Sequence, residues 1–225
     1  MAGETKSYAI KATNIKKKFN DEAVLKGVSL DIAPGEFVSI MGESGSGKST
    51  LLSILAGFLS PDGGSVFWNG KDISDFSEKE LTEIRCTQVG FVFQSYKLIP
   101  TLNIRDNLLL PTVLGKKLNA ESLEYAMSLA EELKIASMLN KFPGELSGGQ
   151  CQRVAIVRAL AYKPSLVILD EPTGALDSVM EGYVMRLLSR INREMGVTVI
   201  QVTHSENVAR YGSRIINLRD GDIKL

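Results

Sequence analysis

The chain has 225 residues, of which 44% are hydrophobic and 23% charged, as is usual for a globular domain. Its 26 basic and 26 acidic side chains cancel, which argues against a protein that binds nucleic acid through an excess of positive charge. The richest apolar stretch, residues 51–59, is much shorter than the roughly 20 residues of a membrane-spanning helix. Two distant cysteines, Cys86 and Cys151, predict neither a disulfide framework nor a zinc site, and we expect buried or half-buried thiols.

The first seventy residues predict short strands separated by turns. The predicted strands are residues 8–13, 23–32, 37–41 and 65–68, and the intervening turns contain Pro34-Gly35, Gly63-Gly64 and Asn69-Gly70. The strand at residues 37–41 runs into a glycine-rich turn, and a helix-like stretch follows at residues 49–58. Lys16, Lys17 and Lys18 are interpreted as a solvated strand face.

The remainder of the chain predicts first helices and then an alternation of strands and helices. Predicted helices cover residues 77–85, 101–110, 119–133 and 179–194, and predicted strands cover residues 89–93, 165–169, 197–202 and 215–218. Strand, helix and strand at this spacing are typical of βαβ units with a parallel sheet. We expect one compact α/β domain, residues 1–225, with a mainly helical lobe inserted near residues 95–160.

Residues 42–49 have the pattern G-x-x-x-x-G-K-S between a predicted strand and a predicted helix. Such a loop binds phosphate because its amides and the positive end of the following helix converge on one anion. Lys48 would reach the β- and γ-phosphates, and Ser49 would hold Mg²⁺ through its hydroxyl. The expected phosphate contacts are Gly42, Ser44, Gly45, Ser46, Gly47, Lys48, Ser49 and Thr50. The alternative is a Gly/Ser-rich loop that merely opens a helix.

A pair of acids follows the apolar run at residues 166–169. A buried parallel strand brings its last residues to the carboxyl edge of the sheet, where ligands of such sheets bind. Asp170 would act on Mg²⁺, and Glu171 would orient or deprotonate the water that attacks the γ-phosphate. Acids that cap a helix are the alternative, but together with the phosphate loop the pair predicts nucleotide hydrolysis.

The segment Leu146-Ser147-Gly148-Gly149-Gln150 predicts a second anion site at a helix end. Ser147 can cap the following helix, and the two glycines leave its first amides uncovered. The alternative is a helix that is only well capped. Beside a complete phosphate loop, the segment indicates that one nucleotide is held from two sides.

These motifs, in this order and over nearly all of the chain, resemble the ATP-binding subunit of ATP-binding cassette (ABC) transporters. Residues 42–49 resemble the Walker A motif of that family, residues 166–171 resemble its Walker B motif and catalytic glutamate, and residues 146–150 are identical to its LSGGQ signature. The resemblance implies a P-loop NTPase (RecA-like) core, an N-terminal antiparallel β subdomain and an inserted α-helical subdomain. It also implies ATP and Mg²⁺ as substrate and cofactor.

Four further residues are identified through the resemblance. Gln94 is similar to the Q-loop glutamine, which contacts Mg²⁺ or the lytic water, and His204 to the switch histidine, which would hold the γ-phosphate and Glu171. Asp177 resembles the D-loop aspartate that contacts the opposite subunit, and Phe19 stands where an aromatic stacks on adenine. Without the other motifs, Gln94 would be a polar strand end, His204 a structural histidine and Asp177 a helix cap.

The resemblance narrows to the macrolide-exporter, lipoprotein-release and bacitracin-resistance branch. The strings that carry it are Gly90-Phe91-Val92-Phe93-Gln94, Leu109-Leu110-Pro111 and residues 173–178. Cys151 and Ser205 depart from the residues usual in the family, and neither is needed for hydrolysis.

The family implies a head-to-tail homodimer around two Mg-ATP, bound to a separate integral membrane permease at the cytoplasmic face of the inner membrane. Residues 96–107 are the candidates for the permease contact. The expected function is export or extraction of a peptide, lipid or drug-like substrate. The alternative is a regulatory, force-transmitting ATPase of a cell-division or antimicrobial-peptide-sensing complex that transports nothing. A chromosome or DNA-repair ATPase would need a coiled coil or zinc ligands that the chain does not have.

Overall fold

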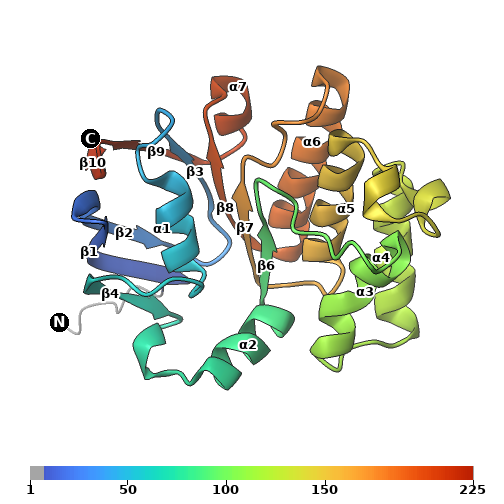
Figure 1. Ribbon diagram of the computed structural model, residues 1–225, viewed down its shortest axis with the longest axis horizontal. Coiled ribbons are helices and arrows are strands. Elements are labelled where there is room, and N and C mark those ends of the chain that lie inside the picture. Colours follow the sequence, from blue (N-terminus) through green and yellow to red (C-terminus); the bar gives the residue numbers. More distant parts are fainter. Residues whose placement is uncertain (1–7, 225) are drawn as a thin grey trace.

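The computed structural model describes residues 8–224, which form two β-sheets with helices between and beside them (Figure 1). The strands are β1 (Ile10–Phe19), β2 (Glu22–Ile32), β3 (Phe37–Met41), β4 (Gly63–Trp68), β5 (Lys71–Asp72), β6 (Val89–Val92), β7 (Leu166–Asp170), β8 (Thr198–Thr203), β9 (Arg214–Arg219) and β10 (Asp222–Lys224). The helices are α1 (Lys48–Leu55), α2 (Glu78–Thr87), α3 (Ile104–Leu114), α4 (Ala120–Glu132), α5 (Gly148–Leu160), α6 (Ser178–Met195) and α7 (Glu206–Ala209).

The larger sheet has six strands in the order β10-β9-β3-β8-β7-β6. Strands β9, β3, β8, β7 and β6 pair in parallel, and β10 closes the edge as an antiparallel partner of β9. Every residue of β6, β7 and β8 is buried, as expected for parallel strands with both faces covered. The parallel pairing brings the carboxyl ends of β3, β8, β7 and β6 to one edge.

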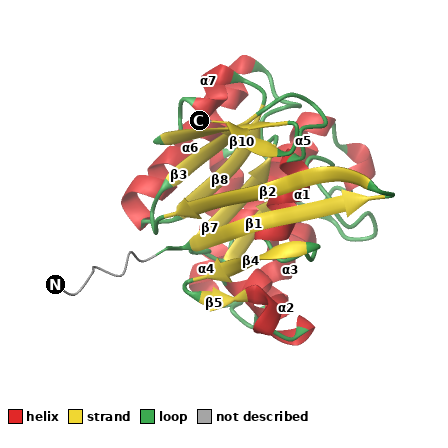
Figure 2. Ribbon diagram, turned by 90° about the vertical axis from the view of Figure 1, so that its left-hand side faces the viewer, coloured by secondary structure: helices red, strands yellow, loops and turns green. Residues whose placement is uncertain are grey.

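The smaller sheet is antiparallel, in the order β2-β1-β4-β5, and faces the viewer in Figure 2. Strand β1 continues to Phe19, beyond the predicted end at Thr13, through irregular pairing between Ala12 and Ile15. On this extension Lys16 and Lys18 are exposed, as predicted for a solvated face, whereas Lys17 is half-buried and its Nζ lies 2.7 Å from Asp62 Oδ1.

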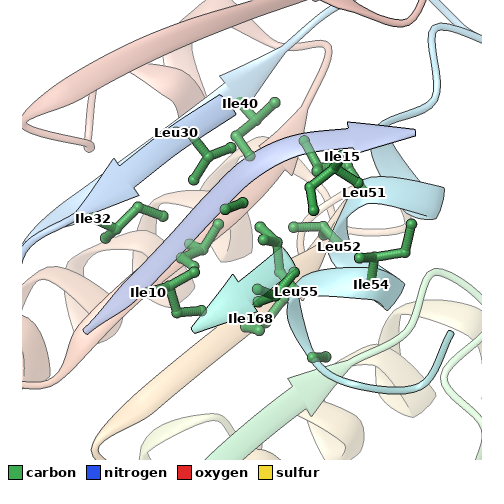
Figure 3. Packing of buried hydrophobic residues seen from close by; sticks show 14 of the residues in the cluster. Ile10, Ile15, Leu30, Ile32, Ile40, Leu51, Leu52, Ile54, Leu55 and Ile168 are labelled. Atoms are coloured by element: carbon green, nitrogen blue, oxygen red, sulfur yellow. The ribbon is translucent and has the colours of Figure 1, made fainter. Parts of the chain in front are cut away.

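Helix α1 lies between the two sheets and fills a first apolar core (Figure 3). Leu51, Leu52 and Leu55 of this helix pack with Ile10 and Ile32 of the smaller sheet, and all five side chains are fully buried. The larger sheet contributes Ile40 and Ile168 to the same cluster. This packing fixes the start of α1, and with it the phosphate loop, against the end of β3.

A second core lies on the other face of the larger sheet, under α3, α4, α5 and α6 (Figure 1). Val167 and Leu169 of β7 point into this cluster, whereas Ile168 between them belongs to the first. Helix α5 packs against β6, α3 and α4, so it joins the helices of the predicted lobe to the sheet. Among residues 8–224, no helix has both the length and the apolar character needed to cross a membrane.

The structure differs from the predicted elements mainly at short or interrupted segments. β5, β10 and α7 are two to four residues long and carry too little periodicity to be recognised. Helix α3 ends at Leu114 instead of Leu110, because it continues past Pro111 and closes with a bond from Gly115 N to Pro111 O. Cys86 is half-buried and Cys151 is buried, and both are free thiols, as predicted.

Candidate active site

A cavity of about 960 Å³ opens at the carboxyl edge of the larger sheet. Four parallel strands end there, which is where open α/β sheets bind ligands. Its lining consists of Val24, Ser44, Gly45, Gly47, Lys48, Ser49, Thr50, Gln94, Tyr96, Gln152, Asp170, Glu171, Gly174, Ala175 and His204. The segments after β3, β6, β7 and β8 therefore bring most of the predicted catalytic and phosphate-binding residues to one space.

The loop after β3 has the backbone shape of an anion cradle. Gly45 and Gly47 adopt positive φ angles of 80° and 97°, a conformation that residues with a Cβ rarely adopt. Gly47 is also the N-cap of α1, and no side chain caps the first amides of this helix. These amides and the positive end of the helix are available to a phosphate group.

Two polar side chains of this loop are buried in a way that suits a bound anion. Lys48 is only 8% exposed, and its Nζ donates hydrogen bonds to Gly42 O at 2.8 Å and Glu43 O at 2.6 Å. Within the described part of the chain, no carboxylate lies within 4.0 Å of this ammonium group, and Ser46 Oγ is buried without a hydrogen-bond partner. A phosphate would supply the negative charge that a buried ammonium group needs.

Asp170 is the last residue of β7 and is only 7% exposed. Its Oδ1 has no hydrogen-bond partner among residues 8–224. Burial raises the pKa of this carboxyl; the Ser49 hydroxyl and the Lys48 charge oppose the shift, and the Glu171 charge adds to it. A buried carboxylate oxygen without a partner is costly unless a cation offsets the charge.

The oxygen donors around Asp170 fit Mg²⁺. Ser49, Gln94 and Asp170 line the same cavity, and they offer a hydroxyl, an amide oxygen and a carboxylate. Mg²⁺ prefers hard oxygen ligands and takes only one or two carboxylates together with phosphate oxygens and water. The unpartnered Oδ1 of Asp170 is therefore the oxygen best suited to such an ion.

Glu171 and His204 form a direct pair at the ends of neighbouring strands. His204 Nδ1 lies 3.0 Å from Glu171 Oε1, with the histidine side chain 73% exposed and the glutamate side chain 15% exposed. An ionised carboxylate can only accept a hydrogen bond, so the imidazole donates from Nδ1. Glu171 has a φ of 51° and donates its own amide to Val202 O at 3.1 Å.

The second predicted anion site lies outside this cavity. Ser147 is the N-cap of α5 and forms a capping box, in which Ser147 N donates to Gln150 Oε1 at 2.8 Å and Gln150 N donates to Ser147 Oγ at 3.3 Å. Ser147 and Gly148 are exposed. The first turn of α5 is thus a capped helix end on the surface.

Four other predicted residues do not line the cavity either. Asp177 is the N-cap of α6 and accepts a hydrogen bond from Met180 N at 2.9 Å. Phe19, at the end of β1, is 47% exposed, with Lys17 Nζ 5.7 Å from the centre of its ring. Gly42 and Ser46 belong to the phosphate loop but are not among the residues that line the cavity. The roles of Asp177 and Phe19 toward a nucleotide or a partner stay predictions.

Five residues that line the cavity were not predicted as site residues: Val24, Tyr96, Gln152, Gly174 and Ala175. Gln152 is a polar residue at 1% exposure in the second turn of α5. The sequence has no signal that distinguishes Gln152 from Arg153 and Arg158, the other long polar side chains of α5 that follow it. Tyr96 was predicted only as part of the segment for the permease contact.

Comparison with known proteins gives matches over most of the chain. The sequence profile of the ABC transporter family matches residues 25–174. The bacitracin export ATP-binding protein BceA of Halalkalibacterium halodurans is 41% identical over 95% of this chain and 86% of its own. The lipoprotein-releasing system ATP-binding protein LolD of Aquifex aeolicus is 44% identical over 95% of each chain.

A third relative, the uncharacterised ABC transporter ATP-binding protein MJ0796 of Methanocaldococcus jannaschii, is 46% identical over 96% of this chain and 95% of its own. Its solved structure as a dimer in a post-hydrolysis state, bound to ADP and Pi, superposes with a TM-score of 0.91. That superposition covers 96% of this chain and 97% of the solved one, at 43% identity.

Proposed function

The chain belongs to the ABC transporter family, and from this membership we propose that it is the ATP-hydrolysing subunit of an exporter or extraction complex. It is an ATPase that uses ATP and Mg²⁺. The observation that supports the assignment most directly is the convergence of the phosphate loop, Gln94, Asp170, Glu171 and His204 on one cavity.

The phosphate loop binds the triphosphate through backbone and side chain together. The uncapped amides at the start of α1 and the buried ammonium group of Lys48 surround the place where the β- and γ-phosphates lie. Ser49, Gln94 and Asp170 would hold Mg²⁺, which supplies charge neutralisation of the phosphates when it is bound. Binding and orientation of the substrate thus rest on groups that are fixed before ATP arrives.

Glu171 and His204 act on the attacking water. The Glu171 carboxylate orients this water and accepts its proton, and the Nδ1–H of His204, 3.0 Å from Oε1, holds the carboxylate in place. His204 is largely exposed while Glu171 is largely buried, so the imidazole can also contact the γ-phosphate while its Nδ1 stays on the carboxylate.

Two copies of the chain clasp two ATP molecules head to tail. Each ATP lies between the phosphate loop of one copy and Ser147, Gly148, Gly149 and Gln150 of the other, and the exposed helix end at Ser147 is suited to that contact. Asp177 contacts the partner copy, and Phe19 stacks on adenine. The solved dimer of the relative MJ0796 with ADP and Pi supports this arrangement. Hydrolysis removes the charge that both helix ends attract, so the dimer loosens.

A membrane permease supplies the transport pathway. The relatives BceA and LolD are named as a bacitracin export ATP-binding protein and a lipoprotein-releasing system ATP-binding protein, which favours a peptide, lipid or drug-like substrate. The subunit binds peripherally at the cytoplasmic face of the inner membrane. Residues 96–107 are the proposed permease contact.

A Glu171→Gln variant tests both the role of Glu171 in hydrolysis and the binding of ATP between two copies of the chain. The neutral amide that replaces the carboxylate cannot accept a proton, so hydrolysis falls by about 10²–10⁴-fold, the usual contribution of a general base, while ATP binding remains. With saturating Mg-ATP, analytical ultracentrifugation should then show a stable dimer.

The matched control is Lys48→Ala, which removes the phosphate contact. It should neither bind ATP tightly nor dimerise. If the Glu171→Gln protein remained a monomer with saturating Mg-ATP, the two-sided clasp would be wrong.

A further inference from the structure

Gln152 connects helix α5 to the loop that carries Glu171. Its Nε2 donates to Glu171 O at 2.6 Å, and its Oε1 accepts from Ala175 N at 2.9 Å. The side chain is only 1% exposed. Both ends of one buried amide are therefore bonded to the backbone of residues 171–175.

The backbone that Gln152 bonds is conformationally strained. Glu171 has a φ of 51°, a left-handed conformation that non-glycine residues keep only where their surroundings impose it. Three hydrogen bonds fix the two peptide groups on either side of the Glu171 Cα: Glu171 N donates to Val202 O, and Glu171 O accepts from Gln152 Nε2 and from Gly174 N. Of these three, only the bond from Gln152 comes from a helix.

The first turn of α5 also packs directly on the same loop. A Cβ atom on Gly149 would stand 2.8 Å from Ala175 O, closer than real Cβ atoms approach. Helix and loop therefore meet backbone to backbone at Gly149 and through the amide of Gln152 one turn later. A displacement of the start of α5 would therefore have to move residues 171–175 as well.

We propose that Gln152 is a positioning residue that couples the anion-binding end of α5 to the catalytic carboxylate of the same chain. The inference rests on the proposed function, in which residues 147–150 contact the ATP held by the partner copy and Glu171 acts on the ATP in its own phosphate loop. ATP at one site thus sets, through Gln152, the geometry of Glu171 at the other site. This link makes hydrolysis cooperative between the two sites.

Two substitutions separate the two bonds of Gln152. Gln152→Glu keeps the shape of the side chain and the oxygen that accepts from Ala175 N. It loses the donor to Glu171 O and places a carboxylate oxygen next to that carbonyl oxygen, where the two repel each other. Gln152→Leu removes both bonds. Leu129→Val in α4, a buried position outside the cavity, is the control for loss of stability alone.

Steady-state ATPase kinetics and nucleotide-binding measurements should show that the Gln152 variants lose turnover but keep nucleotide affinity. We expect kcat to fall by about 100-fold in both Gln152 variants, the cost of a catalytic group misplaced by about 1 Å, with the Kd for ADP within twofold of wild type. The Hill coefficient for ATP should fall from near 2, the number of sites, toward 1. In a Glu171→Gln background, Gln152→Leu should still dimerise with Mg-ATP.

Three outcomes would overturn the coupling. The first is a Hill coefficient near 1 in the wild-type protein. The second is a kcat and a Hill coefficient within twofold of wild type in both Gln152 variants. The third is a loss of kcat in Leu129→Val as large as the loss in the Gln152 variants. Failure of the proposed function is distinguishable, because it shows as absent ATPase activity in the wild-type protein and absent ATP-dependent dimers in the single Glu171→Gln variant.

Discussion

The proposed role of Asp170 in holding Mg²⁺ would come at the expense of stability. Its carboxyl is 7% exposed, one of its oxygens has no partner among residues 8–224, and burial raises its pKa. At neutral pH the charged form is still required if the residue is to hold a cation. The folded protein without Mg²⁺ therefore carries a partly uncompensated buried charge.

Replacing Asp170 with Asn should stabilise the protein in the absence of nucleotide and Mg²⁺. Burial raises the pKa of the Asp170 carboxyl in the folded protein above its ordinary value of 3.8. Ionisation of this group therefore lowers the free energy of unfolding as the pH rises from 3.8 through the folded pKa, and the full loss is present above the folded pKa. We expect a gain on the order of 1 kcal/mol at pH 7.5, or about 2–4 °C in Tm. The gain should shrink as the pH is lowered through the folded pKa toward the ordinary value of 3.8.

Thermal unfolding in EDTA at pH 7.5 and pH 5.5 measures this difference. Adding Mg-ATP is the control, because it should stabilise the wild-type protein more than Asp170→Asn. A variant that melts below wild type at both pH values would show that the Asp170 charge is well compensated in the folded state.

Local sequence was sufficient for some residues of the site and not for others. Lys48 and Asp170 were predicted because each belongs to a short motif of neighbouring residues, and the strand or helix beside that motif can be recognised from the local sequence. Gln152 was not, because its partners are backbone atoms of residues that lie 19 and 23 positions further along the chain. Such contacts depend on tertiary packing.

The segment between β6 and α3 is an irregular element held by buried side chains. Tyr96 and Lys97 adopt positive φ angles of 60° and 47°, and Arg158 donates to their carbonyl oxygens at 2.6 and 2.7 Å. Asn107 is fully buried; it accepts from Ile99 N and donates to Ile99 O. Since buried backbone groups need partners, these side chains replace the hydrogen bonds of a regular element.

Asn107→Leu tests this support. The substitution keeps the size of the side chain but leaves the polar groups of Ile99 without their partner, so we expect a loss on the order of 3 kcal/mol in the free energy of unfolding. Amide hydrogen exchange at residues 99–103 should rise more than elsewhere. Thr112→Val in the same helix, whose buried Oγ1 has no partner within the described chain, should cause neither effect, and equal exchange in the two variants would contradict the argument.

The predicted strand at residues 37–41 matched β3 at both ends, and the predicted helix starts at residues 77 and 119 were correct to within one residue. Ser77, Asn119 and Ser147 each cap a helix that begins at the next residue, through bonds readable from residues three apart. The end of α3 was wrong because a proline normally stops a helix, whereas Pro111 is retained inside this one. The order of the six strands was not predicted, because it depends on pairing between segments that lie far apart in the chain.

At the scale of the whole molecule, the two apolar cores share one sheet. In β7, Ile168 faces the first core while Val167 and Leu169 face the second. β8 repeats the alternation, with Ile200 in the first core and Val199 in the second. A strand cannot keep one face ordered while it loses the other, so the predicted single domain should unfold as one cooperative unit.

Two spectroscopic probes can test this cooperativity separately. Trp68, the single tryptophan, is 6% exposed in the first core and donates from Nε1 to Leu55 O at 2.7 Å, so its fluorescence reports on that core. Circular dichroism at 222 nm reports mainly on the helices, most of which cover the second core. In urea, both signals should give the same midpoint.

Leu188→Ala provides a more stringent test, because it perturbs only one of the two cores. Leu188 of α6 is fully buried and belongs to the second core. The cavity should lower the free energy of unfolding by about 2–5 kcal/mol. If the cores are one unit, the Trp68 fluorescence midpoint moves by the same amount as the circular dichroism midpoint, although Leu188 and Trp68 belong to different cores. If only the circular dichroism midpoint moved, the two cores would unfold independently, and the helices on the second face would be a separate folding domain.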